Sequence, residues 1–285
     1  MCRLFGLATG RPVKATFWLL EAPDSLAAQS RRNPDGYGLA TYRPEVLVEK
    51  RPVAAYADEE FARDANERES PVFLAHVRYA STGRIELANT HPFEHDGRVF
   101  AHNGHLEGLD ALEDRLGDYR RLVHGDTDSE RFFALVLKEA DARGGDLGAG
   151  LVAAARWVAD ELPLYALNCL LATANDVWAL RYPEVHDLYV LERAEGGPGG
   201  ERHFDAASAA GRIRVRSGAL ATCPAVVFAT ERMDEDPGWR ALEPGELVHV
   251  DRDLRIRSEI ALDRAPAHQL RLEDLHAGAA ASQRP

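Results

Sequence analysis

The chain has 285 residues and a mass of 31.4 kDa, enough for one large domain or two small ones. A composition of 45% hydrophobic and 28% charged residues is ordinary for a folded globular protein and argues against wholesale disorder. Because 34 Lys and Arg face 46 Asp and Glu, the formal net charge is −12, which disfavours binding to phosphate backbones or anionic membranes. We therefore expect neither a nucleic-acid nor a membrane partner.

Short apolar segments typical of buried strands recur along the chain, and most are bounded by Gly, Pro, Asn or Asp. The predicted strands are residues 4–8, 37–42, 72–77, 99–102, 168–173, 177–180, 188–191, 225–229 and 246–250. Asn175-Asp176 lies between two of them and predicts a tight hairpin.

Helical spacing of apolar residues is strongest in residues 128–142, from Phe132 to Leu137. It recurs in residues 147–162, 17–31 and 59–67. Because strands outnumber helices and the helices come in blocks, we predict an α+β fold with mainly antiparallel sheets. The glycine-rich residues 195–202 are expected to form a surface loop, and the chain from about residue 277 is expected to be disordered.

Cysteine usage and hydropathy predict the compartment. The three cysteines, Cys2, Cys169 and Cys223, are an odd number without C-x-x-C spacing, so we expect neither a disulfide framework nor a structural zinc site. The chain contains no run of about 20 apolar residues that could span a bilayer, and residues 1–12 lack the apolar stretch of a secretory signal. We expect a cytoplasmic protein.

Cys2 is the first candidate for chemistry. Removal of Met1 would leave Cys2 with an α-amine beside its own thiol. An α-amine titrates near pH 7.7–8.0, so it can accept the thiol proton, and one residue then supplies both nucleophile and base. On position alone, a cysteine that simply follows Met is the favoured interpretation. Cys169 and Cys223 lie in or beside apolar strands and are expected to be inert core thiols.

Three further segments each allow a structural and a functional interpretation. Arg78 follows an apolar strand and is either a surface residue or a bidentate clamp for a carboxylate. Asn103-Gly104 is first a turn signal, but its Asn amide and Gly N–H could also stabilise an oxyanion. Asp128 lies in Thr-Asp-Ser-Glu, which is typical of a helix N-cap, although its carboxylate could bind an ammonium group.

Together these segments resemble the class II glutamine amidotransferase domain, an N-terminal-nucleophile (Ntn) hydrolase. The matching motifs, in the order found in the family, are Met1-Cys2 followed by Leu4-Phe5-Gly6, Asn33-Pro34-Asp35-Gly36-Tyr37-Gly38, Arg78-Tyr79-Ala80-Ser81-Thr82-Gly83, Asn89-Thr90-His91-Pro92-Phe93, His102-Asn103-Gly104 and Thr127-Asp128-Ser129-Glu130. The match covers roughly residues 2–250 and is similar to small stand-alone members, among them the γ-glutamyl hydrolase of ergothioneine biosynthesis. We expect this domain over residues 2–258 and a C-terminal extension over residues 259–285.

The resemblance implies a fold and a set of site residues. The fold is a four-layer αββα sandwich. Cys2 would be the nucleophile, Asn103 and Gly104 the oxyanion hole, and Arg78 and Asp128 the partners of the substrate α-carboxylate and α-ammonium. Three further residues match positions in or near the glutamine pocket: Tyr79, Ser81 and His91. Ser81-Thr82 stand where synthase members carry Thr-His, and no metal or organic cofactor is implied.

The implied activity is cleavage of the γ-amide of glutamine, or of a γ-glutamyl amide, through a γ-glutamyl thioester to release glutamate. One alternative is a glutaminase subunit that delivers ammonia to a separate synthase; a second copy of the chain is a further candidate partner. Another is a degenerate Ntn domain used as a binding module, although Cys2, Asn103 and Asp128 are all retained. A histidine-based metal hydrolase is disfavoured, because the chain has no H-E-x-x-H motif. Its candidate ligands are His76, His91, His95, His102, His105 and His124.

Overall fold

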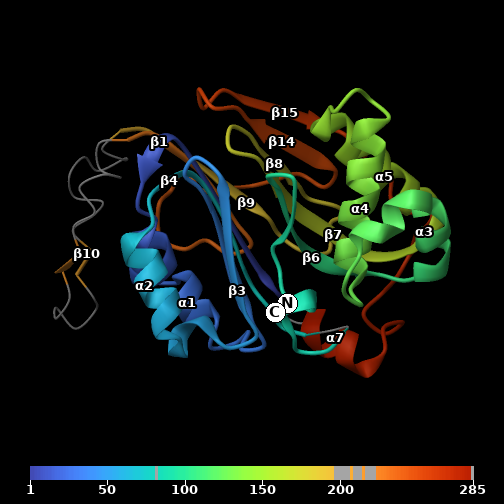
Figure 1. Cartoon of the computed structure of the whole chain (residues 1–285), viewed down its shortest axis with the longest axis horizontal. Coiled ribbons are helices and arrows are strands. Elements are labelled where there is room, and N and C mark those ends of the chain that lie inside the picture. The colour runs from blue at the N-terminus through green and yellow to red at the C-terminus, as the bar shows by residue number, and fades with distance from the viewer. Residues whose placement is uncertain (81–82, 196–205, 208–213, 216–222, 284–285) are drawn as a thin grey trace.

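Two stacked, mainly antiparallel sheets form the centre of the computed structural model, which describes residues 1–80, 83–195, 206–207, 214–215 and 223–283 (Figure 1). The strand order of the first sheet is β13 (Arg240–Ala241), β9 (Tyr189–Arg193), β12 (Ala225–Ala229), β1 (Arg3–Val13), β4 (Ser70–Val77), β2 (Tyr37–Tyr42) and β3 (Val46–Arg51). The order of the second is β15 (Ile256–Ile260), β14 (Glu246–Val250), β8 (Val177–Leu180), β7 (Pro163–Ala172), β6 (Arg98–Leu106) and β5 (Phe93–His95). Two short pairings complete the set: β16 (His268–Gln269) runs parallel to β7, and β10 (Ala206–Ala207) pairs with β11 (Arg214–Val215).

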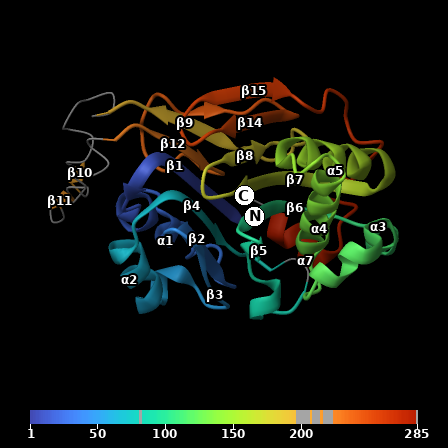
Figure 2. The ribbon, with the colours of Figure 1, turned by 45° about the horizontal axis from the view of Figure 1, so that its top comes forward.

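Helices cover the outer face of each sheet, so the molecule has four layers (Figures 1 and 2). Against the first sheet lie η1 (Phe17–Glu21), α1 (Leu26–Gln29), η2 (Ala55–Ala57) and α2 (Glu59–Glu67). Against the second lie α3 (Leu109–Leu116), η4 (Gly117–Leu122), α4 (Asp128–Asp141) and α5 (Leu147–Glu161). Two short helices stand apart from these layers: η3 (Leu87–Asn89) and α7 (Ala277–Gln283). The predicted αββα sandwich is confirmed.

The buried side chains form one core between the sheets and one under each helical layer. In β1, Leu4 and Ala8 face the second sheet, whereas Phe5 and Leu7 face the helices, because successive strand residues point to opposite faces. Both faces of a central strand are therefore apolar, which explains why the sequence shows continuous apolar runs here instead of alternation. Burying one such large side chain contributes about 1.5–3 kcal/mol.

The side chains of Thr127 and Glu130 fix the first turn of helix α4. The Thr127 hydroxyl accepts the Glu130 N–H at 3.3 Å, and the Glu130 carboxylate reaches back to the His124 and Gly125 N–H groups at 3.1 and 2.6 Å. The predicted helix at 128–142 is confirmed, and its N-cap is Thr127. Asp128 is therefore the first helical residue, and its side chain remains available to other partners.

Some predicted elements differ from the structure. The helix expected over residues 17–31 is divided into η1 and α1, and Pro23 lies between them, where it cannot continue a helix. Helix α3 and the strands β3 and β15 were not predicted. The expected disorder from about residue 277 is wrong for residues 277–283, which form α7. Residues 196–202 of the expected glycine-rich loop lie outside the described residues.

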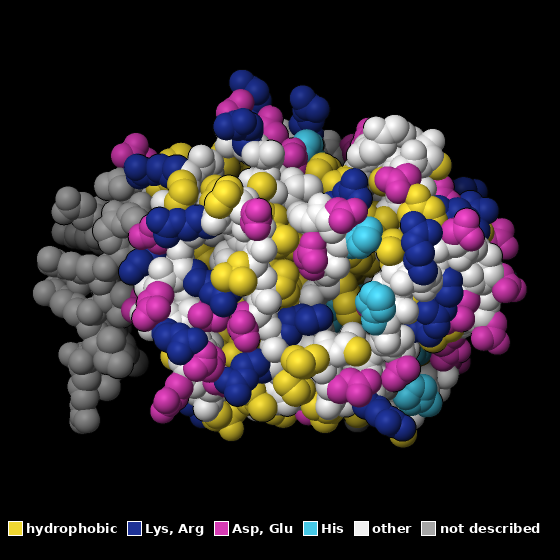
Figure 3. Space-filling view, viewed as in Figure 1, with side chains coloured by type: hydrophobic (Ala, Val, Ile, Leu, Met, Phe, Trp, Pro, Cys, Tyr) yellow, Lys and Arg dark blue, Asp and Glu magenta, His cyan; other side chains and the backbone are white. Residues whose placement is uncertain are grey.

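Two surface properties bear on partners. On the face shown in Figure 3, Lys and Arg side chains are interspersed with Asp and Glu side chains. Within the described part of the chain, no helix combines the length and the apolar character needed to cross a bilayer. The predicted domain boundary near residue 258 stays a prediction.

Candidate active site

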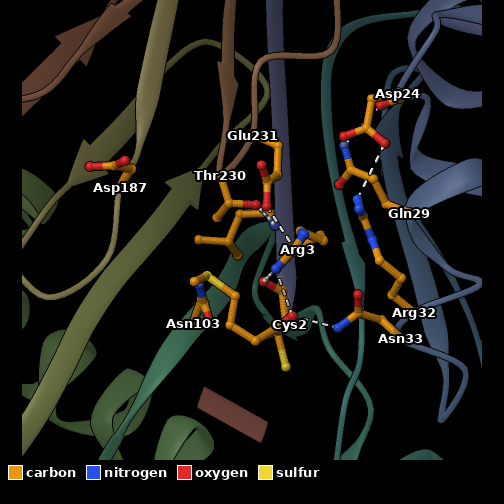
Figure 4. A network of polar contacts seen from close by, with 12 residues as sticks. Cys2, Arg3, Asp24, Gln29, Arg32, Asn33, Asn103, Asp187, Thr230 and Glu231 are labelled. Atoms are coloured by element: carbon orange, nitrogen blue, oxygen red, sulfur yellow. Dashed lines mark hydrogen bonds and ion pairs between the residues drawn. The ribbon is translucent and has the colours of Figure 1, made fainter. Parts of the chain in front are cut away.

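The pairing of β1 with β4 places Cys2 at the end of the first sheet. Arg3 is opposite Val77, so Cys2 lies beside the residues at which β4 ends. The Cys2 thiol donates to the Tyr79 carbonyl at 3.4 Å, and Cys2 Sγ accepts the Tyr79 N–H at 3.3 Å. Figure 4 shows Cys2 at this strand end, close to Asn103. The predicted nucleophile is therefore held at a fixed point by backbone contacts.

Asn103 and Gly104 come from the second sheet, inside β6, and not from the turn that Asn-Gly would suggest. The Asn103 side chain is fully buried, and its Oδ1 accepts no hydrogen bond from any residue that the structure describes. Its Nδ2 lies 3.6 Å from Met1 Sδ. A Cβ on Gly104 would stand 1.9 Å from the Ala166 carbonyl oxygen, so this position requires glycine.

Arg78 is buried at the end of β4 and is held by the Asn33–Gly38 motif. Its N–H donates to the Gly36 carbonyl at 2.8 Å, its carbonyl accepts the Asp35 N–H at 3.1 Å, and Nη1 donates to the Arg84 carbonyl at 3.0 Å. Burial lowers the pKa of the guanidinium, whereas the charges of Cys2, Asp35, Glu86 and Asp128 raise it. Arg78 therefore lies in the same electrostatic neighbourhood as Cys2 and Asp128.

Asp128 is buried at the start of α4, where its carboxylate is anchored by donors. Oδ2 accepts the Leu106 N–H at 3.1 Å, and Oδ1 accepts the Ser129 N–H and hydroxyl at 2.8 and 3.2 Å. These three bonds leave acceptor capacity on a carboxylate, which offers about four lone-pair sites. The Thr-Asp-Ser-Glu segment does form the helix N-terminus, but the N-cap residue is Thr127 and Asp128 is the first residue of the helix.

The remaining predicted residues are placed less directly. Tyr79 contacts Cys2 through its backbone, and Ser81 lies outside the described residues. The His91 ring packs against His76 and Phe93, with centroids 4.3 and 4.6 Å apart, and burial lowers its pKa well below the usual value. The described residues include no cluster of three or more His, Cys, Asp or Glu that could hold a metal ion.

Arg3 is a site residue that the sequence analysis missed. Its side chain is 2% exposed and pairs with Glu231 at 2.8 Å, and its Nη1 donates to the Met1 and Cys2 carbonyls at 2.8 and 3.4 Å (Figure 4). Asn33 Nδ2 also donates to the Met1 carbonyl. Burial and Arg3 lower the pKa of the Met1 amine to about 6. In the sequence, the signal for Arg3 was its position directly before the apolar run of residues 4–8.

The pKa of the Cys2 thiol is shifted in the opposite direction from that of the Met1 amine. Burial raises its pKa, against the Tyr79 hydrogen bond and the positive charges of the N-terminal amine, Arg78 and Arg3. The thiol is therefore protonated at neutral pH and needs a base to become a nucleophile. The other two cysteines are buried in the core, where burial raises the pKa of Cys169 and the Cys223 thiol donates to the Thr9 carbonyl at 3.2 Å.

Two stacked sheets between helical layers, with a cysteine at the start of a central strand, define an Ntn-hydrolase fold. The sequence model of the class II glutamine amidotransferases matches residues 1–270, and the chain belongs to this family.

Individual relatives and solved structures are similar to this chain over different shares of its length. An uncharacterized protein of Methanocaldococcus jannaschii is 30% identical over 204 residues, which are 68% of this chain and 54% of that one. The Saccharomyces cerevisiae protein named Probable glutamine amidotransferase DUG3 is 29% identical over 51% of this chain and 47% of its own. The chain thus spans about half the length of these two relatives. The glutamine phosphoribosylpyrophosphate amidotransferase of Bacillus subtilis, with ADP and GMP, shares the fold at a TM-score of 0.62 and 18% identity, over 93% of this chain and 50% of that one.

Met1 leads to the first testable prediction. While Met1 is attached, the Cys2 nitrogen is an amide without a basic lone pair, and the Met1 sulfur stands beside the Asn103 amide. We expect the active protein to begin at Cys2. Two preparations test this: one released from a cleavable leader so that Cys2 is the first residue, and one that keeps Met1, each checked by intact mass. Glutamate release should occur only in the first; equal activity of both would refute a base supplied by Cys2 itself.

Proposed function

We propose that the protein hydrolyses the γ-amide of glutamine, or of a γ-glutamyl amide, and releases glutamate. The observation that carries this proposal is the burial of three polar groups around the end of β1 at which Cys2 lies. These are the Arg78 guanidinium, the Asp128 carboxylate and the Asn103 amide. The Arg78 cation matches the α-carboxylate of a glutamyl group, and the Asp128 anion matches its α-ammonium. The Asn103 amide can donate a hydrogen bond to its γ-carbonyl.

Substrate recognition follows from the two charges. Arg78 would bind the α-carboxylate through parallel N–H bonds, and the acceptor capacity left on Asp128 would bind the α-ammonium. A zwitterionic ligand can interact with both Arg78 and Asp128, whereas a ligand that lacks either charge can interact with only one of them. The leaving amine is outside these contacts and stays loosely specified.

The proposed reaction begins with transfer of the Cys2 thiol proton to the Cys2 amine. The thiolate attacks the γ-carbonyl carbon, and the Asn103 amide and the Gly104 N–H donate to the resulting oxyanion. The amine, now an ammonium, protonates the leaving nitrogen as the C–N bond breaks, which leaves a γ-glutamyl thioester on Cys2. Water, deprotonated by the same amine, attacks the thioester, and glutamate leaves as the thiol is restored.

The electrostatics around the N-terminus support a terminal amine that acts as the base for the Cys2 thiol. The buried Arg3 guanidinium lies within hydrogen-bonding distance of the Met1 and Cys2 carbonyls, and burial together with this charge lowers the pKa of the Met1 amine. A lowered pKa keeps the amine neutral, and therefore able to accept a proton, at neutral pH. We expect burial and Arg3 to lower the pKa of the Cys2 amine in the same way once Met1 is removed, so activity should decline as the pH falls through that pKa.

An alternative keeps the same chemistry but passes the ammonia to a partner. The match covers 50% of the B. subtilis phosphoribosylpyrophosphate amidotransferase structure, so half of that structure lies outside the similarity. A separate synthase subunit could stand in that place. A second copy of the chain and a cytoplasmic location also stay proposals, the latter supported by three free cysteines. Measuring ammonia release without any partner separates the two functions.

The second prediction identifies the nucleophile. Cys2→Ala should reduce glutamate release from glutamine by about 10³-fold or more, because the thioester can no longer form. The melting temperature should change little, since Cys2 is only half-buried. The matched control is Cys169→Ala, which removes a core thiol from β7 and should leave turnover intact. A similar loss of activity in both variants, or retained turnover in Cys2→Ala, would rule out this mechanism.

The third prediction concerns the recognition pair. Arg78→Ala should lower kcat/KM for glutamine, because the γ-carbonyl is positioned through the α-carboxylate. Arg84→Ala is the control, since its side chain is exposed while its carbonyl still accepts from Arg78. Asp128→Asn should also lower kcat/KM, by an amount that corresponds to a loss of about 1.5–3 kcal/mol of transition-state stabilisation.

A des-amino analogue of glutamine tests Asp128 against a purely structural role. The analogue should be a poor substrate for the wild type but should lose little further activity with Asp128→Asn, because the interaction is already absent. Independent, additive losses would show that Asp128 only anchors the Leu106 and Ser129 N–H groups.

A further inference from the structure

The C-terminal helix α7 returns to the proposed oxyanion hole. Gln283 Nε2 donates to the Gly104 carbonyl at 3.2 Å, across 179 residues of chain. The Gln283 side chain is 3% exposed, and Ser282 beside it is fully buried. Figures 1 and 2 both show α7 close to the N-terminal strand end. A glutamine carboxamide is thus enclosed beside a residue that we place in the reaction.

The oxygen of the Gln283 carboxamide faces His186. The His186 Nε2 lies 2.8 Å from Gln283 Oε1, and burial lowers the His186 pKa to about 4, so the ring is neutral at neutral pH. The carboxamide thus bridges two groups, with Oε1 at the His186 ring and Nε2 at the Gly104 carbonyl, and this pairing corresponds to the ring tautomer that carries its proton on Nε2. The His186 carbonyl is itself fixed, because Asn168 Nδ2 and Arg181 Nε donate to it at 3.1 and 2.9 Å.

Helix α7 is held in place independently of Gln283. Leu275 and Ala279 pack against Tyr165 and Ala166 of β7. The His276 ring accepts the Ala279 N–H at 3.2 Å, and the hydroxyl of Ser282 donates to the Ala279 carbonyl at 2.8 Å. The helix is therefore seated on the strand adjacent to β6, and a substitution at Gln283 leaves that seat intact.

The pairing of β6 with β7 does not give the Gly104 carbonyl the Leu167 N–H as a donor. Its partner across the ladder is Leu167, but the Leu167 N–H donates to the Tyr182 carbonyl at 2.7 Å and is not available to Gly104. The ladder between β6 and β7 also shifts register between His105 and Leu106. Glycine adds no side-chain restraint of its own. The Gln283 bond therefore supplies a restraint on this residue.

We propose that Gln283, aligned by His186, is a positioning residue that holds Gly104 so that its N–H is aimed at the oxyanion. The catalytic consequence rests on the proposed function, since only a reaction with an oxyanion makes use of that N–H. Gln283 acts through Gly104 and is not itself a catalytic residue. A bond that only steadies the transition state should influence kcat more than KM.

The test uses Gln283→Met, which keeps the length of the side chain but removes both hydrogen-bonding groups. The control is Gln269→Met, at an exposed position of β16. In the full-length protein, Gln283→Met should lower kcat for glutamine by about 10- to 100-fold with KM little changed. Alkylation of Cys2 by iodoacetamide, which forms no oxyanion, should proceed at the wild-type rate. His186→Ala should reproduce the defect, and the double variant should be no worse than either single one.

Other results would overturn the proposal. Unchanged kcat in Gln283→Met, or an equal loss of turnover and of Cys2 alkylation, would show that Gln283 merely supports the local structure. Hydrogen exchange of the peptide containing Gly104 provides a readout without turnover: it should accelerate in Gln283→Met and not in Gln269→Met. If the wild type released no glutamate, the proposed function would fail, while this exchange measurement would still decide whether Gln283 holds Gly104.

Discussion

The antiparallel pairing of β1 with β4 is the constraint on which the site depends. It sets Arg3 opposite Val77, so that Cys2 meets the backbone of Tyr79. A shift of one residue would move Leu4 and Phe5 to the wrong faces of the sheet, because side chains alternate with a period of two. The two cores on either side of β1 therefore fix the register. The position of the thiol is a consequence of apolar packing.

Around that thiol, buried charges are stabilised largely by backbone groups. Arg78 donates to a carbonyl, Asp128 accepts from N–H groups, and Arg3 divides its donors between backbone carbonyls and Glu231. Rigid backbone partners hold these charges in place before a substrate arrives, which is the condition for electrostatic stabilisation without reorganisation. In the same environment, burial raises the pKa of the thiol and lowers that of the terminal amine. That amine belongs to Met1; in our proposal the Cys2 amine takes its place after Met1 is removed and forms with the thiol a neutral pair that becomes reactive by one proton transfer.

Local sequence predicted the elements whose stability is local or uniformly apolar. The strands at 72–77 and 225–229 and the capped helix α4 are of this kind. The fold family and the proposed site residues came from ordered motifs, because no single one of them was specific. Helix α7 could not be predicted, since its Ala-Gly-Ala-Ala-Ala-Ser-Gln sequence has no large apolar stripe and depends on contacts with Tyr165 and Ala166. The contact of Gln283 with Gly104 is equally non-local, and nothing near either residue in the sequence indicates it.

Trapping the covalent intermediate tests most directly whether Cys2 is the nucleophile. The protein would be mixed with glutamine, quenched in acid during turnover and analysed by intact mass and peptide mapping. The account predicts a mass increase of one γ-glutamyl group on the peptide that begins at Cys2, absent in Cys2→Ala and removed by hydroxylamine. An adduct on Cys169 or Cys223, or glutamate release at an undiminished rate from Cys2→Ala, would contradict it.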